Sequence, residues 1–461
     1  MPFRWDIHAK LTPTREQPAD PENDVPAPVA ASPGHEPKRV SWKRLKLHPL
    51  AHVGPGLITG VADDDPSGIA TYSQAGAQFG LNMLWTMPLS FPMMSAVQSM
   101  CALIGRATGK GLAANIKLSF PPFVLKAVVA LLLIANVLNI SADIAAMGEV
   151  AELVTKINRH AMTALFVAVT LLLQIAVPYH RYVFYLKWLT LSLLAYAAVL
   201  FTVHVPWKEV AWRTLWPHLT FSSNAATMVV AVFGTTISPY LFFWQASEEV
   251  EDMRLSATAK PLSQDPAAGS TEMIRIKWDT WNGMFYSNIA AYFIILATAV
   301  TLHVAGVTDI TTAAQAAGAL RPLAGELAYF LFALGILGVG LIGVPVLAGS
   351  ASYALCEAMG WQWGLERKAK DARGFYGVIA VSVLAAMIIQ YSPIPPMKAL
   401  FWSAVINGVV AVPLVAVVAL LASRRSVMGG FTAPKLVIQL GWITAIVMGF
   451  ATAWMLISVS R

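Results

Sequence analysis

The feature that most constrains this chain is a series of apolar segments, each near the ~20 residues that a helix needs to cross a bilayer. Only 12% of the 461 residues are charged, against about 25% in soluble domains. Because backbone groups cannot pair with water inside lipid, such segments must be helical. The sequence therefore predicts an all-α polytopic membrane protein. We expect about eleven spans, at roughly 51–79, 82–105, 122–153, 160–178, 183–204, 224–248, 282–305, 325–357, 374–391, 397–422 and 436–459.

The charges between these segments predict an orientation. Lysine and arginine are concentrated in the loops after the even-numbered spans, and cytoplasmic loops carry such an excess. We therefore expect a multi-pass protein of the cell's inner (plasma) membrane, with the N-terminus in the cytoplasm and the C-terminus outside. Residues 1–46 are polar and proline-rich, which predicts a disordered cytoplasmic tail. Residues 47–461 are predicted to form the transmembrane domain.

Two of the expected spans carry signals that interrupt a helix. The first contains GVADDDPSGIA, in which Pro66, Ser67 and Gly68 follow three adjacent aspartates. The sixth contains FGTTISPY, with Gly234 and Pro239 at the corresponding break. Proline removes a backbone hydrogen bond, and glycine weakens the helix around it. Paired breaks in segments that cross in opposite directions predict an inverted five-plus-five repeat with a binding site near the midplane. The repeats are expected at about 51–204 and 224–422, with an extra helix at 436–459.

These motifs resemble those of the NRAMP family of divalent metal transporters, from about Gly54 to the tenth span. The family's Asp-Pro-Gly-Asn motif falls on Asp65 and the three residues after it, within GPGLITGVADDDPSGIATYSQAGAQFGLNMLW. LNISADIAAMGEV is similar to the family's acidic third helix, where Asp143 keeps the first acid. GTTISPYLFFW is similar to the family's sixth helix, which carries a Met-Pro-His motif. The resemblance implies a LeuT-like fold and the import of divalent metals, usually together with protons.

Several positions depart from the family motifs. Ser238 stands where the family has its metal-binding methionine, and Tyr240 and Gln245 stand at its two histidine positions. Gly68 replaces an asparagine, and Ala146 replaces the second acid of the third helix. A thioether favours soft transition metals, whereas Mg²⁺ and Mn²⁺ accept oxygen ligands. The pattern resembles the NRAMP-related magnesium transporters, which lack the methionine, and favours Mg²⁺ with Mn²⁺ also carried.

The expected metal ligands are therefore oxygen atoms. Asp65 is the leading candidate, and Asp64 is a further one. The other candidates are the Ser238 hydroxyl and the backbone carbonyls near Ala62, Thr235 and Thr236. The ion is the substrate, and no resident cofactor is expected. Since histidine is the usual relay near neutral pH, its loss from both positions predicts weak or absent proton coupling. The alternative is a proton-coupled Mn²⁺/Fe²⁺ symporter.

Acidic side chains in the third span leave two interpretations open. Asp143 and Glu149 are candidates for a proton relay, because ionisable groups inside a membrane are functional candidates by default. Glu149 lies one turn from the lost second acid and could replace it. The other interpretation is that Asp143 pairs with a basic neighbour such as Arg373.

Four further polar residues are expected to line a secondary cavity near the ion: Asp63, Tyr240, Gln245 and Asn407. For Asn407, a hydrogen bond that packs two helices is the competing interpretation. The acidic run at residues 248–252, after the sixth span, is either a solvated helix end or an acidic exit path for a cation.

Other functional classes agree less well with the sequence. A LeuT-like transporter of a small organic substrate remains an alternative, but three adjacent acids would repel a substrate carboxylate. A membrane enzyme is not indicated, because the sequence has no HExxH motif, no glycine-rich phosphate loop and no credible nucleophile–histidine pair. Nucleic acid is not an expected partner, because the basic residues lie at helix ends rather than in one patch. No obligate protein partner is evident.

Overall fold

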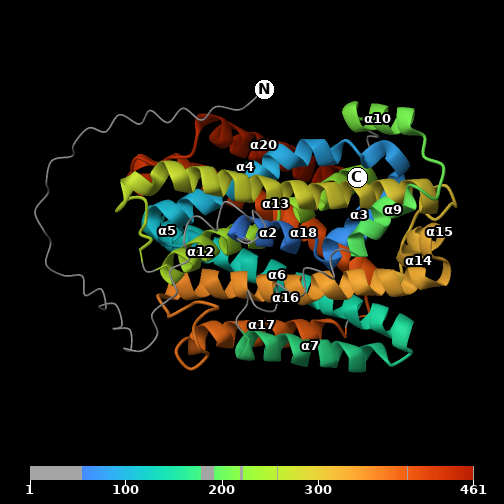
Figure 1. Cartoon of the computed structure of the whole chain (residues 1–461), viewed down its shortest axis with the longest axis horizontal. Helices are drawn as coiled ribbons and strands as arrows, with labels where there is room; N and C mark the ends of the chain where they lie inside the picture. Colours follow the sequence, from blue (N-terminus) through green and yellow to red (C-terminus); the bar gives the residue numbers. More distant parts are fainter. Residues whose placement is uncertain (1–53, 178–191, 219–221, 257, 392, 460–461) are drawn as a thin grey trace, which may run out of the picture. The chain divides into compact units, whose positions relative to one another are not determined.

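The computed structural model describes residues 54–177, 192–218, 222–256, 258–391 and 393–459. Within these ranges every regular element is helical (Figure 1), as the sequence predicts. The predicted tail at 1–46 and much of the predicted fifth span at 183–204 lie outside the described residues.

The helices are numbered along the chain. Those before residue 220 are α2 (Pro55–Asp63), α3 (Pro66–Phe79), η1 (Gly80–Met83), α4 (Thr86–Thr108), α5 (Leu112–Ser119), α6 (Pro122–Thr155), α7 (Arg159–Ala176), α9 (Leu194–Val199) and α10 (Trp207–Leu215). Those from 222 to 327 are α11 (Ser223–Thr236), α12 (Pro239–Leu255), η3 (Pro266–Ala268), α13 (Gly269–Thr298), η4 (Ala299–His303), α14 (Ala313–Ala317), η5 (Gly318–Leu320), α15 (Arg321–Ala324) and η6 (Gly325–Leu327). The last are α16 (Ala328–Met359), α17 (Arg373–Ile389), α18 (Pro396–Ser423), α19 (Arg425–Met428) and α20 (Lys435–Val459).

The described helices account for ten of the eleven predicted spans. Eight segments in the described part of the chain are long and apolar enough to cross a membrane, counting α11 with α12 as one. Helix α17 is apolar but shorter. The first predicted span is divided between α2 and α3, so neither half reaches the length of a crossing. Together these elements match every predicted span except the fifth.

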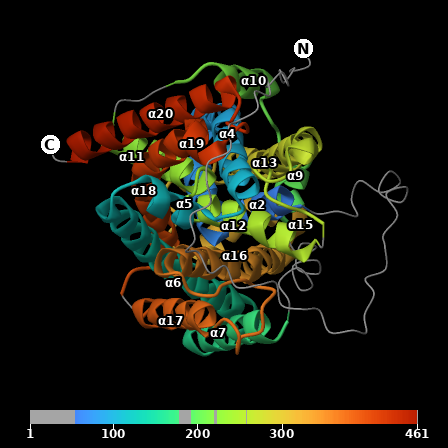
Figure 2. The ribbon, with the colours of Figure 1, turned by 90° about the vertical axis from the view of Figure 1, so that its left-hand side faces the viewer.

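The two broken helices lie against each other. Helix α2 packs on α12, and α3 packs on α11, so each half of one broken helix contacts the opposite half of the other. Helix α6 packs against α16, α17 and α18. Figures 1 and 2 place α7 and α17 together along one edge and α20 at the opposite edge. Both breaks therefore lie in the interior, where neighbouring helices surround the freed backbone groups.

Helices α2 and α13 approach closely through glycine. A Cβ atom on Gly60 would overlap the backbone of Gly283, and one on Gly283 would overlap the backbone of Gly56. Small residues allow two helix backbones to approach this closely inside a membrane. The α2 half-helix is therefore held directly on the surface of α13.

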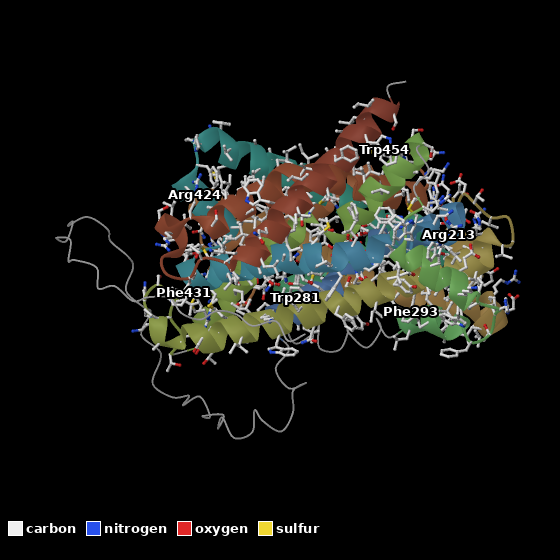
Figure 3. All side chains as sticks on the ribbon, turned by 90° about the horizontal axis from the view of Figure 1, so that it is seen from above. Arg213, Trp281, Phe293, Arg424, Phe431 and Trp454 are labelled. Atoms are coloured by element: carbon white, nitrogen blue, oxygen red, sulfur yellow. The ribbon has the colours of Figure 1, made fainter. Side chains whose placement is uncertain are left out.

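The opposite face of α13 is apolar and exposed. Trp278 is 65% exposed and Phe285 is 52% exposed. Figure 3 shows Trp281 on the same outer side of this helix, and it places Arg424 and Arg213 towards opposite ends of the bundle. Large apolar side chains that face outwards along a membrane helix are those that contact lipid.

Candidate functional site

The first break is created locally by Asp65 and Pro66. Helix α2 ends at Asp63 and α3 begins at Pro66, which occupies the first helical position, where its missing N–H is not needed. Asp65 is the N-cap of α3: its Oδ1 accepts hydrogen bonds from Gly68 N at 2.8 Å and from Ser67 Oγ at 2.6 Å. Aspartate is among the most favourable N-cap residues. The residue predicted to bind the ion thus also starts the second half-helix.

The second break lies at Ile237 and Ser238, immediately before Pro239. The Ser238 hydroxyl donates to the carbonyls of Gly234 at 3.0 Å and Thr235 at 2.8 Å. It therefore completes the end of α11 instead of capping α12, and its oxygen lone pairs stay available. The neighbouring Thr236 hydroxyl likewise donates within α11, to the Val232 carbonyl at 3.0 Å.

The two breaks face each other across Asp65. The Tyr240 hydroxyl lies 3.0 Å from the Ala62 carbonyl and 3.3 Å from Asp65 Oδ2. Its single hydrogen can serve one of these acceptors at a time. On the other side, a Cβ atom on Gly68 would lie 3.2 Å from the Thr235 hydroxyl. Among the residues proposed from the sequence, the structure therefore brings Asp65, Ala62, Thr235 and Tyr240 together.

Two residues that the sequence analysis did not select complete the surroundings of Asp65. Asn139 on α6 donates from Nδ2 to Asp65 Oδ2 at 3.0 Å, and Ser403 on α18 donates to Asn139 Oδ1 at 2.7 Å. The same hydroxyl also lies 2.7 Å from the Leu400 carbonyl, so its single hydrogen serves one of these two acceptors at a time. A signal was present, because Asn136, Asn139 and Asp143 recur at helical spacing in an otherwise apolar span.

Asp63 and Asp64 point away from this cluster. The Ser287 hydroxyl on α13 lies 2.6 Å from Asp63 Oδ2 and 3.1 Å from Asp64 Oδ1. All three aspartates are at most 1% exposed, yet they divide between two sets of partners. Among the described residues, no group of three or more acidic, histidine or cysteine side chains is arranged to hold a metal ion. A metal at Asp65 would therefore depend on backbone and neutral oxygens.

The predicted ion pair between Asp143 and Arg373 is not formed. Asp143 is fully buried on α6, where its electrostatic partners are Asp65 and the backbone of Ser67. Arg373 is exposed at the first residue of α17. Periodicity could not reveal this, because it does not show which turn of α6 faces the end of α17. Asp143 instead lies beside the first turn of α3.

Glu149 has a different role from the predicted replacement acid. Its Oε1 accepts a hydrogen bond from the backbone N–H of Ala313 at 2.7 Å, at the start of α14. The carboxylate thus holds the segment that connects η4 to α16. None of its hydrogen bonds in the described part of the chain reaches Asp65 or its partners.

The remaining predicted cavity residues are buried. Gln245 accepts a hydrogen bond from the Thr59 hydroxyl at 2.5 Å, which joins α12 to α2. Asn407 on α18 is 1% exposed, and neither polar atom of its amide has a hydrogen-bond partner among the described residues. The alternative of a helix-packing hydrogen bond at Asn407 is therefore not observed.

The acidic run at the end of α12 is largely structural. Glu249 is fully buried and forms an ion pair with Arg275, and Glu251 accepts from the Tyr353 hydroxyl at 2.8 Å. Only Asp252 of this run is exposed. Neither a solvated helix end nor an open acidic path describes Glu249 and Glu251, because Arg275 of α13 and Tyr353 of α16 pair with them.

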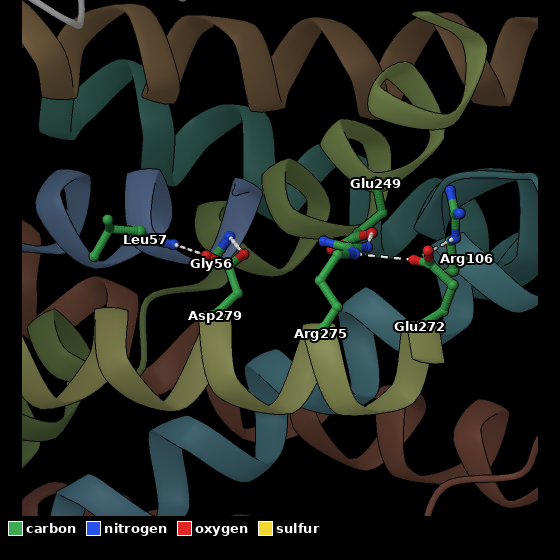
Figure 4. A network of polar contacts seen from close by, with 7 residues as sticks. All are labelled: Gly56, Leu57, Arg106, Glu249, Glu272, Arg275 and Asp279. Carbon is green, nitrogen blue, oxygen red and sulfur yellow. Dashed lines mark hydrogen bonds and ion pairs between the residues drawn. The ribbon is translucent and has the colours of Figure 1, made fainter. Parts of the chain in front are cut away.

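Figure 4 shows the polar network around this end of α13. Arg275 also pairs with Glu272 at 2.9 Å, and Glu272 pairs with Arg106 of α4 at 3.1 Å. One turn further, Asp279 accepts from Gly56 N at 2.7 Å and from Leu57 N at 3.3 Å, at the start of α2. One face of α13 therefore binds α4, α12 and α2.

Comparison with known sequences gives a consistent result. A family model described as natural resistance-associated macrophage protein-like matches residues 56–458. A divalent metal cation transporter MntH of Acidiphilium cryptum is 25% identical over 428 residues, which cover 85% of this chain and 86% of the relative. The MntH protein of Yersinia pestis is 28% identical over 322 residues, which cover 67% of this chain and 74% of the relative.

Comparison with solved structures supports the fold. A manganese transporter of Eremococcus coleocola superposes with a TM-score of 0.69 at 18% identity, covering 92% of this chain and 88% of that one. Mhp1, a nucleobase-cation-symport-1 family transporter, superposes with a TM-score of 0.52 at 12% identity, covering 88% and 93%. Likeness at these identities shows the fold alone. It confirms the predicted LeuT-like fold with two broken helices.

Proposed function

The chain belongs to the natural resistance-associated macrophage protein (Nramp) family, whose model matches residues 56–458, and on that premise we propose that it imports divalent metal ions, Mg²⁺ foremost and Mn²⁺ as well. The observation that carries this proposal is the meeting of both helix breaks at Asp65, where acidic, carbonyl and hydroxyl oxygens converge. The midplane break is where transporters of this design bind their substrate.

The proposed ligands are hard oxygen donors. Asp65 supplies the charge, and the carbonyls of Ala62 and Thr235 and the Ser238 hydroxyl supply neutral oxygens, with Thr236 as a further carbonyl. No sulfur ligand occupies the second break, since Ser238 stands there. Oxygen ligands suit Mg²⁺, which keeps several waters when it binds. The ligand chemistry supports the choice of ion more strongly than the likeness of fold to other transporters does, because one fold can carry many functions.

We further propose that uptake is weakly coupled to protons or not coupled. Tyr240 and Gln245 occupy the two positions where a histidine relay would stand, and neither side chain exchanges a proton near neutral pH. One observation favours the alternative of proton-coupled Mn²⁺ symport: Asp143 is buried beside Asp65 without a basic partner among the described residues. In that alternative, the proton gradient and the membrane potential would drive uptake together.

Uptake into proteoliposomes tests ion and coupling together. The measurement compares Mg²⁺, Mn²⁺ and Ca²⁺ at equal concentrations, with and without a pH gradient. We expect Mg²⁺ and Mn²⁺ uptake that follows the membrane potential and changes little with the pH gradient. Robust metal-evoked acidification of the lumen would establish the symporter instead, and Mn²⁺ uptake without Mg²⁺ uptake or competition would overturn the magnesium assignment.

The orientation of the chain is also a proposal. The positive-inside pattern supports an N-terminus in the cytoplasm and a C-terminus outside, in the inner membrane. In this orientation the network around Arg275 lies on the cytoplasmic side of Asp65, because it surrounds the start of α2.

Restoring a thioether at the second break should change ion preference. In Ser238→Met, we expect Mg²⁺ uptake relative to Mn²⁺ uptake to fall about tenfold, which corresponds to ~1.4 kcal/mol, because a soft ligand favours the transition metal. The ratio is measured by competition in proteoliposomes. Ser238→Ala, which removes the hydroxyl without adding sulfur, is the control. An unchanged ratio in Ser238→Met would mean that residue 238 does not contact the ion.

Removing the Tyr240 hydroxyl should strengthen ion binding. The phenol donates to oxygens that the ion would need, so the ion must displace a hydrogen bond worth about 1 kcal/mol. We expect Tyr240→Phe to lower the KM for Mn²⁺ roughly 2- to 10-fold. Tyr376→Phe serves as the matched control, because that hydroxyl donates to the Arg367 carbonyl at 2.9 Å, outside the site. A higher KM in Tyr240→Phe would make the phenol oxygen itself a ligand.

A further inference from the structure

Asp63 and Asp64 form a cluster that the Asp65 site does not use. Their carboxyl groups converge on the Ser287 hydroxyl of α13, at 2.6 and 3.1 Å. The partners of Asp65 come instead from α3, α6 and α12. The three consecutive aspartates therefore contact two separate groups of side chains.

The two buried carboxyl groups have no basic partner among the described residues. Asp63 is 0% exposed and Asp64 is 1% exposed, and one hydroxyl hydrogen can satisfy only one of them. In the described part of the chain, Asp63 Oδ1 and Asp64 Oδ2 have no hydrogen-bond partner, and their charged neighbours are other aspartates. A buried carboxylate without a compensating positive charge is strongly unfavourable. A positively charged ligand would remove that cost.

The Tyr72 side chain is a second observation that points to a ligand. It is fully buried on α3, and its hydroxyl, which lies near Thr235, has no well-formed hydrogen bond among the described residues. Its strongest electrostatic neighbours are Asp63 and then Asp64. A buried hydroxyl without a hydrogen-bond partner, whose main charged neighbours are these two carboxyl groups, is the arrangement that bound water or a hydrated ion would complete.

We propose that Asp63, Asp64 and Ser287 form a second cation site, distinct from the Asp65 site, that holds a hydrated divalent ion. Two carboxylates balance one dication, whereas a monovalent ion would leave one charge uncompensated. The retained waters of an ion such as Mg²⁺ donate to Asp63 Oδ1 and Asp64 Oδ2, which protein groups do not reach. The identity of the ion rests on the proposed function, since both sites face the same substrate.

Two adjacent sites have a consequence for transport. Asp64 directly precedes Asp65 in the chain, so an ion at the second site lies next to the first. Repulsion between neighbouring ions weakens the binding of each, which allows tight selection and fast release in the same pathway. The second site therefore speeds release from Asp65 instead of competing with it.

The number of bound ions tests the proposal directly. The full chain is purified in detergent, and Mn²⁺ binding is measured by equilibrium dialysis with detection of free Mn²⁺ by electron paramagnetic resonance. We expect about two Mn²⁺ ions per wild-type chain. The Asp63→Asn/Asp64→Asn double variant, which keeps side-chain shape, and the Asp65→Asn variant should each bind one ion fewer. Asp309→Asn is the control, since that exposed acid pairs with Lys398, and it should bind as the wild type does.

Several outcomes would overturn the second site. These are a single ion on the wild-type chain, an unchanged number on the double variant, or displacement of one Mn²⁺ by excess Na⁺ at equal affinity. If the double variant does not fold, the Ser287→Ala variant is tested instead. One of its two Mn²⁺ ions should bind about tenfold more weakly than in the wild type. Unchanged affinities for both ions would refute the second site. Normal transport by the Asp65→Asn variant would overturn only the assignment of Asp65 as an ion ligand. The second site would still stand, because it is tested by the ion that the Asp63→Asn/Asp64→Asn variant loses.

Discussion

Asp65→Asn is expected to reduce Mg²⁺ and Mn²⁺ uptake about 100-fold or more, beyond the 10- to 100-fold typical of losing a residue that only supports a metal ligand. The reason is that, in the part of the chain that the structure describes, Asp65 is the acid that contacts both helix breaks and lies beside the proposed neutral ligands. Asparagine keeps the size of the side chain and removes its charge. Initial uptake rates in proteoliposomes, over a range of ion concentrations, measure the loss.

Asparagine is chosen because it separates transport from folding. Asp65 also caps α3, and alanine at an N-cap costs about 0.5–2 kcal/mol, whereas asparagine caps as well as aspartate. Asp65→Asn should therefore elute and melt as the wild type does. Ser222→Ala is the matched control, because it removes the N-cap of α11, where Ser222 Oγ accepts from Ala225 N at 3.2 Å. That variant should be slightly less stable and fully active. Normal uptake by Asp65→Asn would refute the site.

Arg275→Leu is expected to destabilise the protein by about 1–3 kcal/mol, below the roughly 3–5 kcal/mol found when one partner of a fully buried ion pair is removed, because the Arg275 side chain is 30% exposed. Glu249 is fully buried and pairs with Arg275, so the substitution leaves its carboxylate without a charged partner. The same change releases Glu272 from its contact at 2.9 Å. Thermal unfolding followed by fluorescence-detected size exclusion measures the effect.

A second substitution distinguishes lost charge compensation from lost packing. Adding Glu249→Leu to Arg275→Leu removes the orphaned charge, and replacing both members of a buried pair by apolar residues is often neutral. Most of the stability should therefore return in the double variant. Arg321→Leu is the control, because its ion pair with Glu326 is exposed and contributes little. A double variant as unstable as Arg275→Leu would show that the guanidinium acts through packing.

The sequence was sufficient for the features that depend on neighbouring residues. Pro66 and Pro239 mark the starts of α3 and α12 because proline acts on the backbone beside it. The long apolar segments were sufficient to predict the crossing helices. The choice of Asp65 among the three aspartates came from the resemblance to the Asp-Pro-Gly-Asn motif, and its position as the N-cap directly before Pro66 is what the structure adds.

Features that depend on the other helices could not be read in this way. Adjacent aspartates have different partners: Asp63 and Asp64 at the end of α2 contact Ser287, while Asp65, the N-cap of α3, contacts Asn139. Glu249 looks like a solvent-exposed acid in sequence, yet it is buried and pairs with Arg275, which lies 26 positions further along the chain. The partner of Asn139 is more than 260 positions away in the chain, at Ser403, beyond the reach of any periodicity argument.

The contacts of α13 also determine which parts can move independently. Helix α13 contacts α2 from the start of α2 to its last residue. Asp279 binds the first turn of α2, Gly283 packs on Gly60 in the middle, and Ser287 binds Asp63 at the end. Three attachments spread over one short helix leave it no freedom to rotate on its partner. Any opening on that side must carry both helices as one rigid body or break all three contacts. Helix α3 packs on the same helix further along, where a Cβ atom on Gly76 would overlap Ile295 and Thr298, so in the first case the rigid body includes α3 and the three aspartates move with it.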